Sequence, residues 1–167
     1  MTYCNFGPAA PDEKIVYGAC RPGSTSDPPT ESDIEVWLDY MEKRDIQRVC
    51  CLLDEKLRLY DDLLERYEER FGSEHVRSVP ITDHSVVLPE TFHDRIRPFL
   101  NDSVKQEQRV VVHCSEGSGR TGHVLALWLA HARDYTLPAA VEAVASAGDA
   151  RRNPLEAATM DDLRDIL

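Results

Sequence analysis

The chain has 167 residues, of which 42% are hydrophobic, which is sufficient for one domain with a buried core. Asp and Glu outnumber Lys and Arg by 30 to 19, and the net charge of −11 excludes a general affinity for nucleic acid or anionic membranes. No apolar run approaches the roughly 20 residues that cross a bilayer, and residues 1–11 lack the pattern of a signal peptide. We therefore expect a cytoplasmic monomer without a nucleic-acid or membrane partner.

The acidic excess is combined with only four lysines, a composition that resembles salt-adapted proteins, whose carboxylate-rich surfaces are screened by concentrated salt. The alternative is an ordinary acidic cytosolic protein. The five cysteines are odd in number and form no C-x-x-C pair, so neither a disulfide nor a zinc site is expected. Cys50 and Cys51 lie in an apolar run and are interpreted as core residues, whereas Cys4 and Cys20 carry no usable signal.

The chain begins with alternating strand and helix patterns. A strand is predicted over residues 14–20, followed by a Pro/Gly/Ser-rich loop over 21–30. Ser32 and Glu35 form a capping-box pattern, which predicts the start of a helix that ends near residue 44. That helix places four apolar side chains at helical spacing: Ile34, Trp37, Leu38 and Met41.

The same alternation continues to the end of the chain. Strands are predicted over 46–53, 75–81 and 109–113, and helices over 57–71, 89–104 and 121–135, followed by two shorter helices. This order predicts one α/β domain spanning residues 1–167, with a central, mainly parallel sheet flanked by helices on both faces.

Residues 110–122 read VVVHCSEGSGRTG and predict a buried strand, a tight loop and a helix. A loop whose backbone N–H groups converge at a helix N-terminus binds anions, and Gly117 and Gly119 permit that backbone path. Cys114 lies between the positive helix end and Arg120, both of which favour the nucleophilic thiolate. The Arg120 guanidinium matches phosphate oxygens in a bidentate manner. The segment therefore predicts a phosphate site with a cysteine nucleophile.

The segment from His113 to Thr121 resembles the H-C-x-x-G-x-G-R-[S/T] signature of the protein tyrosine phosphatase superfamily and is most similar to the small dual-specificity phosphatases. The resemblance implies a phosphatase that acts through a phosphocysteine and needs no cofactor or metal. It implies that Thr121 hydrogen-bonds the cysteine sulfur and that His113 orients the loop, although a strand-end histidine without that function is the alternative. The phosphate-binding loop would comprise Ser115, Glu116, Gly117, Ser118, Gly119 and Arg120.

The resemblance also implies a general acid on a separate upstream loop. Asp83 is the candidate because it follows a predicted strand and precedes Cys114 by 31 residues. Alternatively, Asp83 is an aspartate of a surface turn without a catalytic role. Asp94 is a second, weaker candidate for the acid. The tryptophan that opens this loop in many relatives is absent. Many relatives also carry a glutamine after the segment corresponding to Arg151–Pro154, and this chain does not.

Other interpretations of the same glycines explain less. A dinucleotide site fits G-x-G-x-x-G formally but leaves Cys114 and Arg120 unexplained, and a P-loop would require a lysine instead of Arg120. A phosphate-recognition module without turnover, or a sulfur-transfer or arsenate-reducing enzyme with Cys20 as its partner thiol, remain alternatives.

The substrate is expected to be a phosphorylated protein or a small phosphate ester, bound in a shallow pocket. Glu116 stands where phosphoinositide-specific relatives carry a lysine, and it should repel a polyanion. Arg21 and Arg152 are interpreted as surface arginines, with contact to the site as the alternative.

Overall fold

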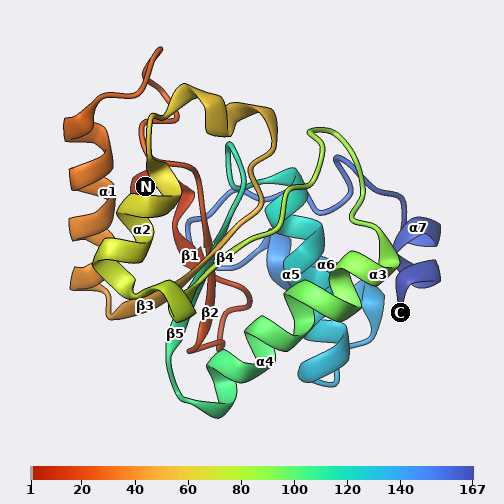
Figure 1. The fold of residues 1–167 in the computed structure, drawn as a ribbon. Coiled ribbons are helices and arrows are strands. Elements are labelled where there is room, and N and C mark those ends of the chain that lie inside the picture. Colours follow the sequence, from red (N-terminus) through yellow and green to blue (C-terminus); the bar gives the residue numbers. More distant parts are fainter. Residues whose placement is uncertain (1) are drawn as a thin grey trace.

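A five-stranded sheet lies at the centre of this computed structural model, which describes residues 2–167 (Figure 1). The strand order is β1-β2-β5-β3-β4, and all neighbours are parallel except β1 and β2. The predicted, mainly parallel sheet is therefore confirmed, while the short antiparallel β1 was not predicted. The strands are β1 Gly7–Pro8, β2 Val16–Ala19, β3 Ile46–Cys51, β4 Val76–Ser78 and β5 Arg109–His113.

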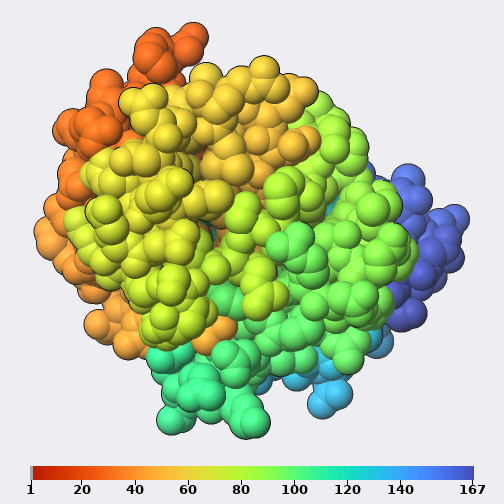
Figure 2. All heavy atoms as spheres, viewed as in Figure 1, coloured from red at the N-terminus to blue at the C-terminus, as the bar shows by residue number. Residues whose placement is uncertain are grey.

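Helices cover both faces of the sheet, as the alternation predicted (Figure 1). Two helices pack on one face, α1 Glu31–Lys43 and α2 Leu63–Phe71. The other face carries α3 Pro89–Thr91, α4 Arg97–Lys105, α5 Gly119–Ala132, α6 Leu137–Ala145 and α7 Met160–Ile166. Figure 2 shows side chains from the region of α2 to α4 covering most of the near face. None of the helices among residues 2–167 has the length and apolar character needed to span a membrane.

The start of α1 differs from the prediction. Thr30, not Ser32, is the N-cap, because its Oγ1 accepts a hydrogen bond from the Asp33 backbone N–H at 3.1 Å. The Asp33 carboxylate in return accepts from the Thr30 N–H at 2.8 Å. Ser32 lies inside the helix. Thr30 and Asp33 form the capping box, so the pair Ser32 and Glu35 does not cap the helix.

The predicted helix over 57–71 is divided in two. A 3₁₀ helix covers Glu55–Leu59, and α2 starts only at Leu63. Between them Tyr60 is extended and buried, and its hydroxyl donates to the Pro22 carbonyl at 2.5 Å. Anchoring this ring interrupts the helix. Gly72 ends α2 with a φ of 98°, as the C-cap prediction required.

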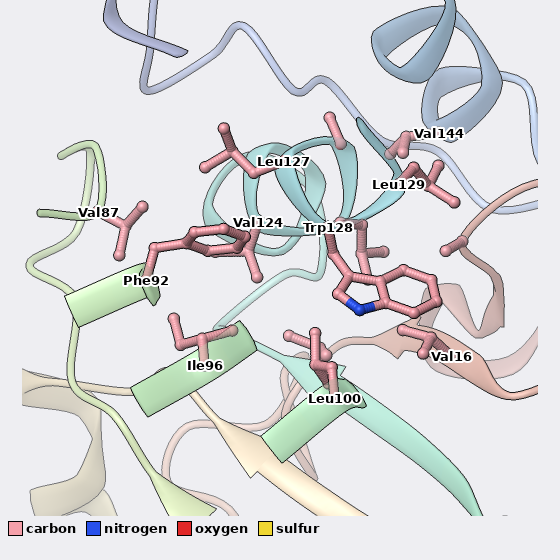
Figure 3. Close-up of a cluster of buried hydrophobic side chains, with 14 of the residues drawn as sticks. Val16, Val87, Phe92, Ile96, Leu100, Val124, Leu127, Trp128, Leu129 and Val144 are labelled. Carbon is pink, nitrogen blue, oxygen red and sulfur yellow. The ribbon is translucent and has the colours of Figure 1, made fainter. Parts of the chain in front are cut away.

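The helix α5 is apolar on nearly all sides because it lies between the sheet and the outer helices. In Figure 3 Trp128 of α5 extends towards Val16 of β2 and Leu100 of α4. The indole N–H is satisfied by the Asn101 side-chain oxygen at 3.0 Å. Burial of each such large side chain stabilises the fold by roughly 1.5–3 kcal/mol, so α5 is firmly fixed and its first turn is a rigid base for a site.

Candidate active site

Cys114 lies at the centre of the carboxyl edge of the sheet. Ala19 of β2 and Cys51 of β3 are both in register with His113, the last residue of β5. The three strands therefore end together, and the next residue of the middle strand is Cys114. Only 3% of Cys114 is exposed. In α/β sheets this edge is where ligands bind.

The loop from Cys114 to α5 needs glycine for space as well as for conformation. Gly117 has a φ of 76°, and a Cβ there would lie 2.5 Å from the Ala19 carbonyl oxygen and 2.9 Å from the Cys20 nitrogen. A Cβ on Gly119 would lie 2.8 Å from a carboxylate oxygen of Glu156. The loop can therefore press against the end of β2 only with glycine at position 117.

A pocket of about 250 Å³ opens over this loop. It is lined by side chains and backbone from four separate parts of the chain: Lys56, Asp83, His84, Cys114, Ser115, Glu116, Gly119, Arg120, Glu156 and Ala157. Cys114, Arg120 and Asp83 thus share one cavity. The rival acid Asp94 is exposed and does not line it.

Arg120 joins the phosphate loop to the loop that carries Asp83. Its side chain is 4% exposed, and its Nη1 donates to the Ile81 carbonyl at 2.9 Å. The other terminal nitrogen lies 3.2 Å from the Asp83 carboxylate. Asp83 itself is 53% exposed. The guanidinium is therefore held in the pocket lining by two contacts, one to a backbone carbonyl and one to a carboxylate.

His113 is buried behind the loop. Its Nδ1–H donates to the Cys114 carbonyl at 3.0 Å, and its Nε2 accepts from the Tyr67 hydroxyl at 2.9 Å. Burial lowers the pKa of His113 to about 4, so the ring is neutral at physiological pH. The ring thus links the Cys114 backbone to Tyr67. That it orients the loop stays a prediction.

The hydroxyl residues of the signature have different surroundings. Ser115 Oγ accepts from Arg21 Nε at 3.2 Å, and Ser118 Oγ accepts from the Asn153 N–H at 3.1 Å. Thr121 Oγ1 is buried and forms no hydrogen bond with any described residue. The expected bond to the Cys114 sulfur is therefore not formed in this structure, and Thr121 retains an unused donor beside the loop.

Arg21 and Arg152 are both buried, so their interpretation as surface arginines was wrong. Arg21 reaches the phosphate loop through Ser115 and also donates to the Tyr60 hydroxyl at 3.0 Å. Arg152 instead donates to the backbone carbonyls of Gly7 and Pro8, each at 2.6 Å. The Pro/Gly-rich composition around Arg21 suggested exposure, but tertiary contacts override it.

The expectation of no disulfide was also wrong. Cys4 and Cys20 are bonded, with their Cα atoms 5.1 Å apart. Sixteen residues separate them, and nothing in that spacing signals a bond. Cys20 is thus bonded to Cys4, so it is not a free thiol of the kind that the arsenate-reducing alternative needs. Cys50 and Cys51 are buried core residues, as predicted.

His123 is a site residue that the sequence did not reveal. On α5, one turn after the loop, its Nδ1–H donates to the Gly119 carbonyl at 3.1 Å, and its Nε2 accepts from the Val87 N–H at 3.1 Å. It therefore ties the Asp83 loop to the start of α5. The only signal for it is a polar residue in an otherwise apolar helix. Among residues 2–167, no group of three or more His, Cys, Asp or Glu side chains is placed to hold a metal ion.

Comparison with known proteins decides the family. A sequence model of the family described as "Polymorphic toxin system, DSP-PTPase phosphatase" matches residues 25–133. The chain belongs to the dual-specificity and tyrosine phosphatases. The phosphatase is also 40% identical over 78 residues to the uncharacterized protein MJ0215 of Methanocaldococcus jannaschii, and the match covers 46% of each chain. The phosphatase thus spans about half the length of the curated relative it matches.

Solved structures share the fold over nearly the whole chain. The active form of Tk-PTP superposes with a TM-score of 0.74 at 21% identity, covering 99% of the phosphatase and 97% of Tk-PTP. PTPMT1 gives 0.70 at 14% identity, with 96% and 92% covered. The kinase associated phosphatase, in a structure whose catalytic-site cysteine is replaced by serine, gives 0.69 at 17% identity, with 90% and 83% covered.

Proposed function

We propose that this chain hydrolyses phosphomonoesters, either phosphotyrosine and phosphoserine/threonine in proteins or small phosphate esters, through a phosphocysteine on Cys114. The observation that carries the proposal is the single pocket in which Cys114, Arg120 and Asp83 meet at the carboxyl end of β5. Membership of the phosphatase family supports the same chemistry.

In the first step the Cys114 thiolate attacks phosphorus, the S–P bond forms and the P–O bond to the leaving group breaks. The leaving oxygen takes a proton from Asp83. Arg120 and the loop N–H groups stabilise the charge on the remaining phosphoryl oxygens. Phosphate binding displaces the Asp83 carboxylate from Arg120. The released carboxylate takes up a proton from solvent, and this protonated Asp83 approaches the leaving oxygen.

In the second step water attacks phosphorus and the S–P bond breaks. Asp83 accepts the proton of the water, and the products are inorganic phosphate and the restored thiolate. The protonation states of Asp83 and Cys114 are thus returned to their starting point without another reactant.

The lining of the pocket supports a broad substrate range. None of its ten lining residues is Phe, Tyr or Trp, so no aromatic slot restricts it to the long phosphotyrosine side chain. An open site of this kind admits the short phosphoserine and phosphothreonine side chains as well.

The test is hydrolysis of p-nitrophenyl phosphate in the presence of a chelator, with Cys114→Ser beside the wild type. We expect the substitution to lower kcat by at least about 10³-fold, because the hydroxyl is a far weaker nucleophile than the thiolate. Phosphate binding by Cys114→Ser should be retained.

Two results would contradict the proposal. One is turnover that survives in Cys114→Ser. The other is a folded wild-type protein that binds phosphate without turning over any phosphomonoester, which would favour a phosphate-recognition module.

A further inference from the structure

Asn5 contacts the phosphate loop from behind, 111 residues away from it in the sequence. Its side-chain Nδ2 donates to the carbonyls of Glu116 at 3.3 Å and Gly117 at 3.1 Å. An anion-binding loop directs its N–H groups towards the ligand, so the carbonyls of the same peptide units point outwards and need donors there. Asn5 supplies that donor at the two residues in the middle of the loop.

The same amide also holds a second segment beside the pocket. Nδ2 donates to the Arg151 carbonyl at 2.9 Å, and Oδ1 accepts from the Arg151 N–H. Two residues further along, the Asn153 N–H donates to Ser118 in the phosphate loop. Asn5 therefore takes the place of a peptide group between two segments. Glu116 of the first lines the cavity, and the second leads to Glu156 and Ala157, which also line it.

The backbone around Asn5 is held in an unusual conformation. Cys4 and Asn5 have φ angles of 53° and 54°, in the left-handed region that residues other than glycine seldom occupy. Surrounding bonds fix it there: the disulfide from Cys4 to Cys20, and a hydrogen bond from the Cys20 N–H to the Cys4 carbonyl at 2.7 Å. The Asn5 side chain is therefore presented to the loop from a backbone that these contacts restrain.

Cys20 extends this restraint to the loop itself. Its backbone abuts Gly117, and the next residue, Arg21, donates its N–H to the Ser115 carbonyl at 3.0 Å. The disulfide therefore joins the two segments that contact the rear of the loop, Asn5 on one side and residues 20–21 on the other.

We propose that Asn5, held by the Cys4–Cys20 disulfide, is a positioning residue that keeps the phosphate loop in its anion-binding conformation. This inference rests on the proposed function of the loop but concerns how the loop is held. Loss of the Asn5 donor removes its hydrogen bonds to the Glu116 and Gly117 carbonyls of the loop, as well as the one to Arg151. The peptide units of Glu116 and Gly117 can then rotate, which removes N–H groups from the phosphate.

The experiment compares Asn5→Asp and Asn5→Ala with the wild type and with Thr2→Ala. Asn5→Asp keeps the shape of the side chain but has no donor. Thr2, whose hydroxyl donates to the Phe6 carbonyl in the same segment, is the matched control. We expect a 10- to 100-fold weaker affinity for inorganic phosphate in both Asn5 variants, and a similar loss in kcat/KM. The concentration of inorganic phosphate that half-protects Cys114 from alkylation should rise by the same factor, because the loop N–H groups that hold the phosphate are displaced.

A merely structural role would lower the melting temperature without moving phosphate affinity, or the phosphate concentration that half-protects Cys114 from alkylation, in protein that remains folded. Asn5→Asp with wild-type values for both would overturn the proposal. If the wild type itself binds phosphate but turns nothing over, the proposed function fails, while phosphate affinity still decides the role of Asn5.

The disulfide is tested by the paired substitution Cys4→Ser/Cys20→Ser. We expect a several-fold loss of phosphate affinity in the same direction as Asn5→Ala. Wild-type affinity in the paired variant would overturn the part of the proposal that concerns the disulfide.

Discussion

Asp83 is paired with Arg120 in this structure, whereas its proposed chemistry requires contact with the leaving oxygen. The two groups are 3.2 Å apart, and the aspartate is half exposed on a loop. Arg120 is fixed on its other side by the Ile81 carbonyl, so the aspartate is the partner that can move. In the proposed mechanism, phosphate bound to the guanidinium therefore also releases Asp83.

Asp83→Asn should reduce activity in a way that depends on the leaving group. An amide cannot donate the proton, so we expect kcat to fall about 10²- to 10⁴-fold for an alkyl phosphate or phosphoserine peptide. The loss should be much smaller for p-nitrophenyl phosphate, whose leaving group needs little protonation. Steady-state rates on both substrates measure the difference, with Asp94→Asn as the exposed control outside the pocket. Equal losses on the two substrates would contradict the assignment.

The local residues of the site could be predicted, and the distant ones could not. Cys114, Arg120 and Gly117 follow one another closely, so one short segment specifies their chemistry and their backbone path. Asn5 and His123 act through partners 111 and 36 residues away. Their function depends on which segments the fold brings together, and an isolated Asn or His carries no sign of that.

At the level of elements, the pattern of apolar residues predicted the sheet and most helices because burial imposes a period on each of them. The errors lie where a single contact decides the outcome. Tyr60 interrupts a helical pattern by reaching Pro22, and Thr30 replaces Ser32 as a cap through Asp33. The strand β1 has two residues, too few to show any period.

His113 at the end of β5 and His123 near the start of α5 are buried and neutral. The stability of the fold should therefore depend on pH. Burial lowers the pKa of both His113 and His123 from 6.5 to about 4. Between these values the unfolded chain binds protons that the folded chain does not. The free energy of unfolding should therefore decrease as pH falls from about 6.5 to about 4, by up to about 1.4 kcal/mol per pH unit for each histidine.

Urea unfolding at pH 7, 6 and 5 measures this slope. His123→Gln should reduce the pH dependence by about half, because one of the two buried rings is removed. His84→Gln is the control, since the His84 side chain is 79% exposed. A slope that His123→Gln leaves unchanged would show that the ring is not neutral in the folded protein.

Across the whole molecule, negative charge surrounds a site built for an anion. The chain carries a net charge of −11, and Glu116 and Glu156 line the pocket beside Asp83. Lys56 and Arg120 are the cationic residues of the same lining. In the proposed mechanism Arg120 binds the phosphoryl group, so the field of the other charged residues acts on the rest of the substrate. Substrates with positive charge next to the phosphate should therefore be hydrolysed preferentially, and substrates with additional phosphates should be hydrolysed less well.

This argument predicts that a phosphopeptide flanked by arginines is hydrolysed with a kcat/KM about five-fold higher than the same peptide flanked by glutamates. Glu116→Gln should lower the ratio of the two kcat/KM values, while Glu142→Gln, on the exposed surface of α6, should not. Molar potassium chloride should also narrow it, because exposed charges are screened over a few ångströms at that ionic strength. A ratio that persists unchanged in high salt would show that shape, rather than charge, discriminates between the peptides. Higher activity towards the glutamate-flanked peptide would contradict the prediction outright, since the carboxylates at the pocket would then be attracting what they should repel.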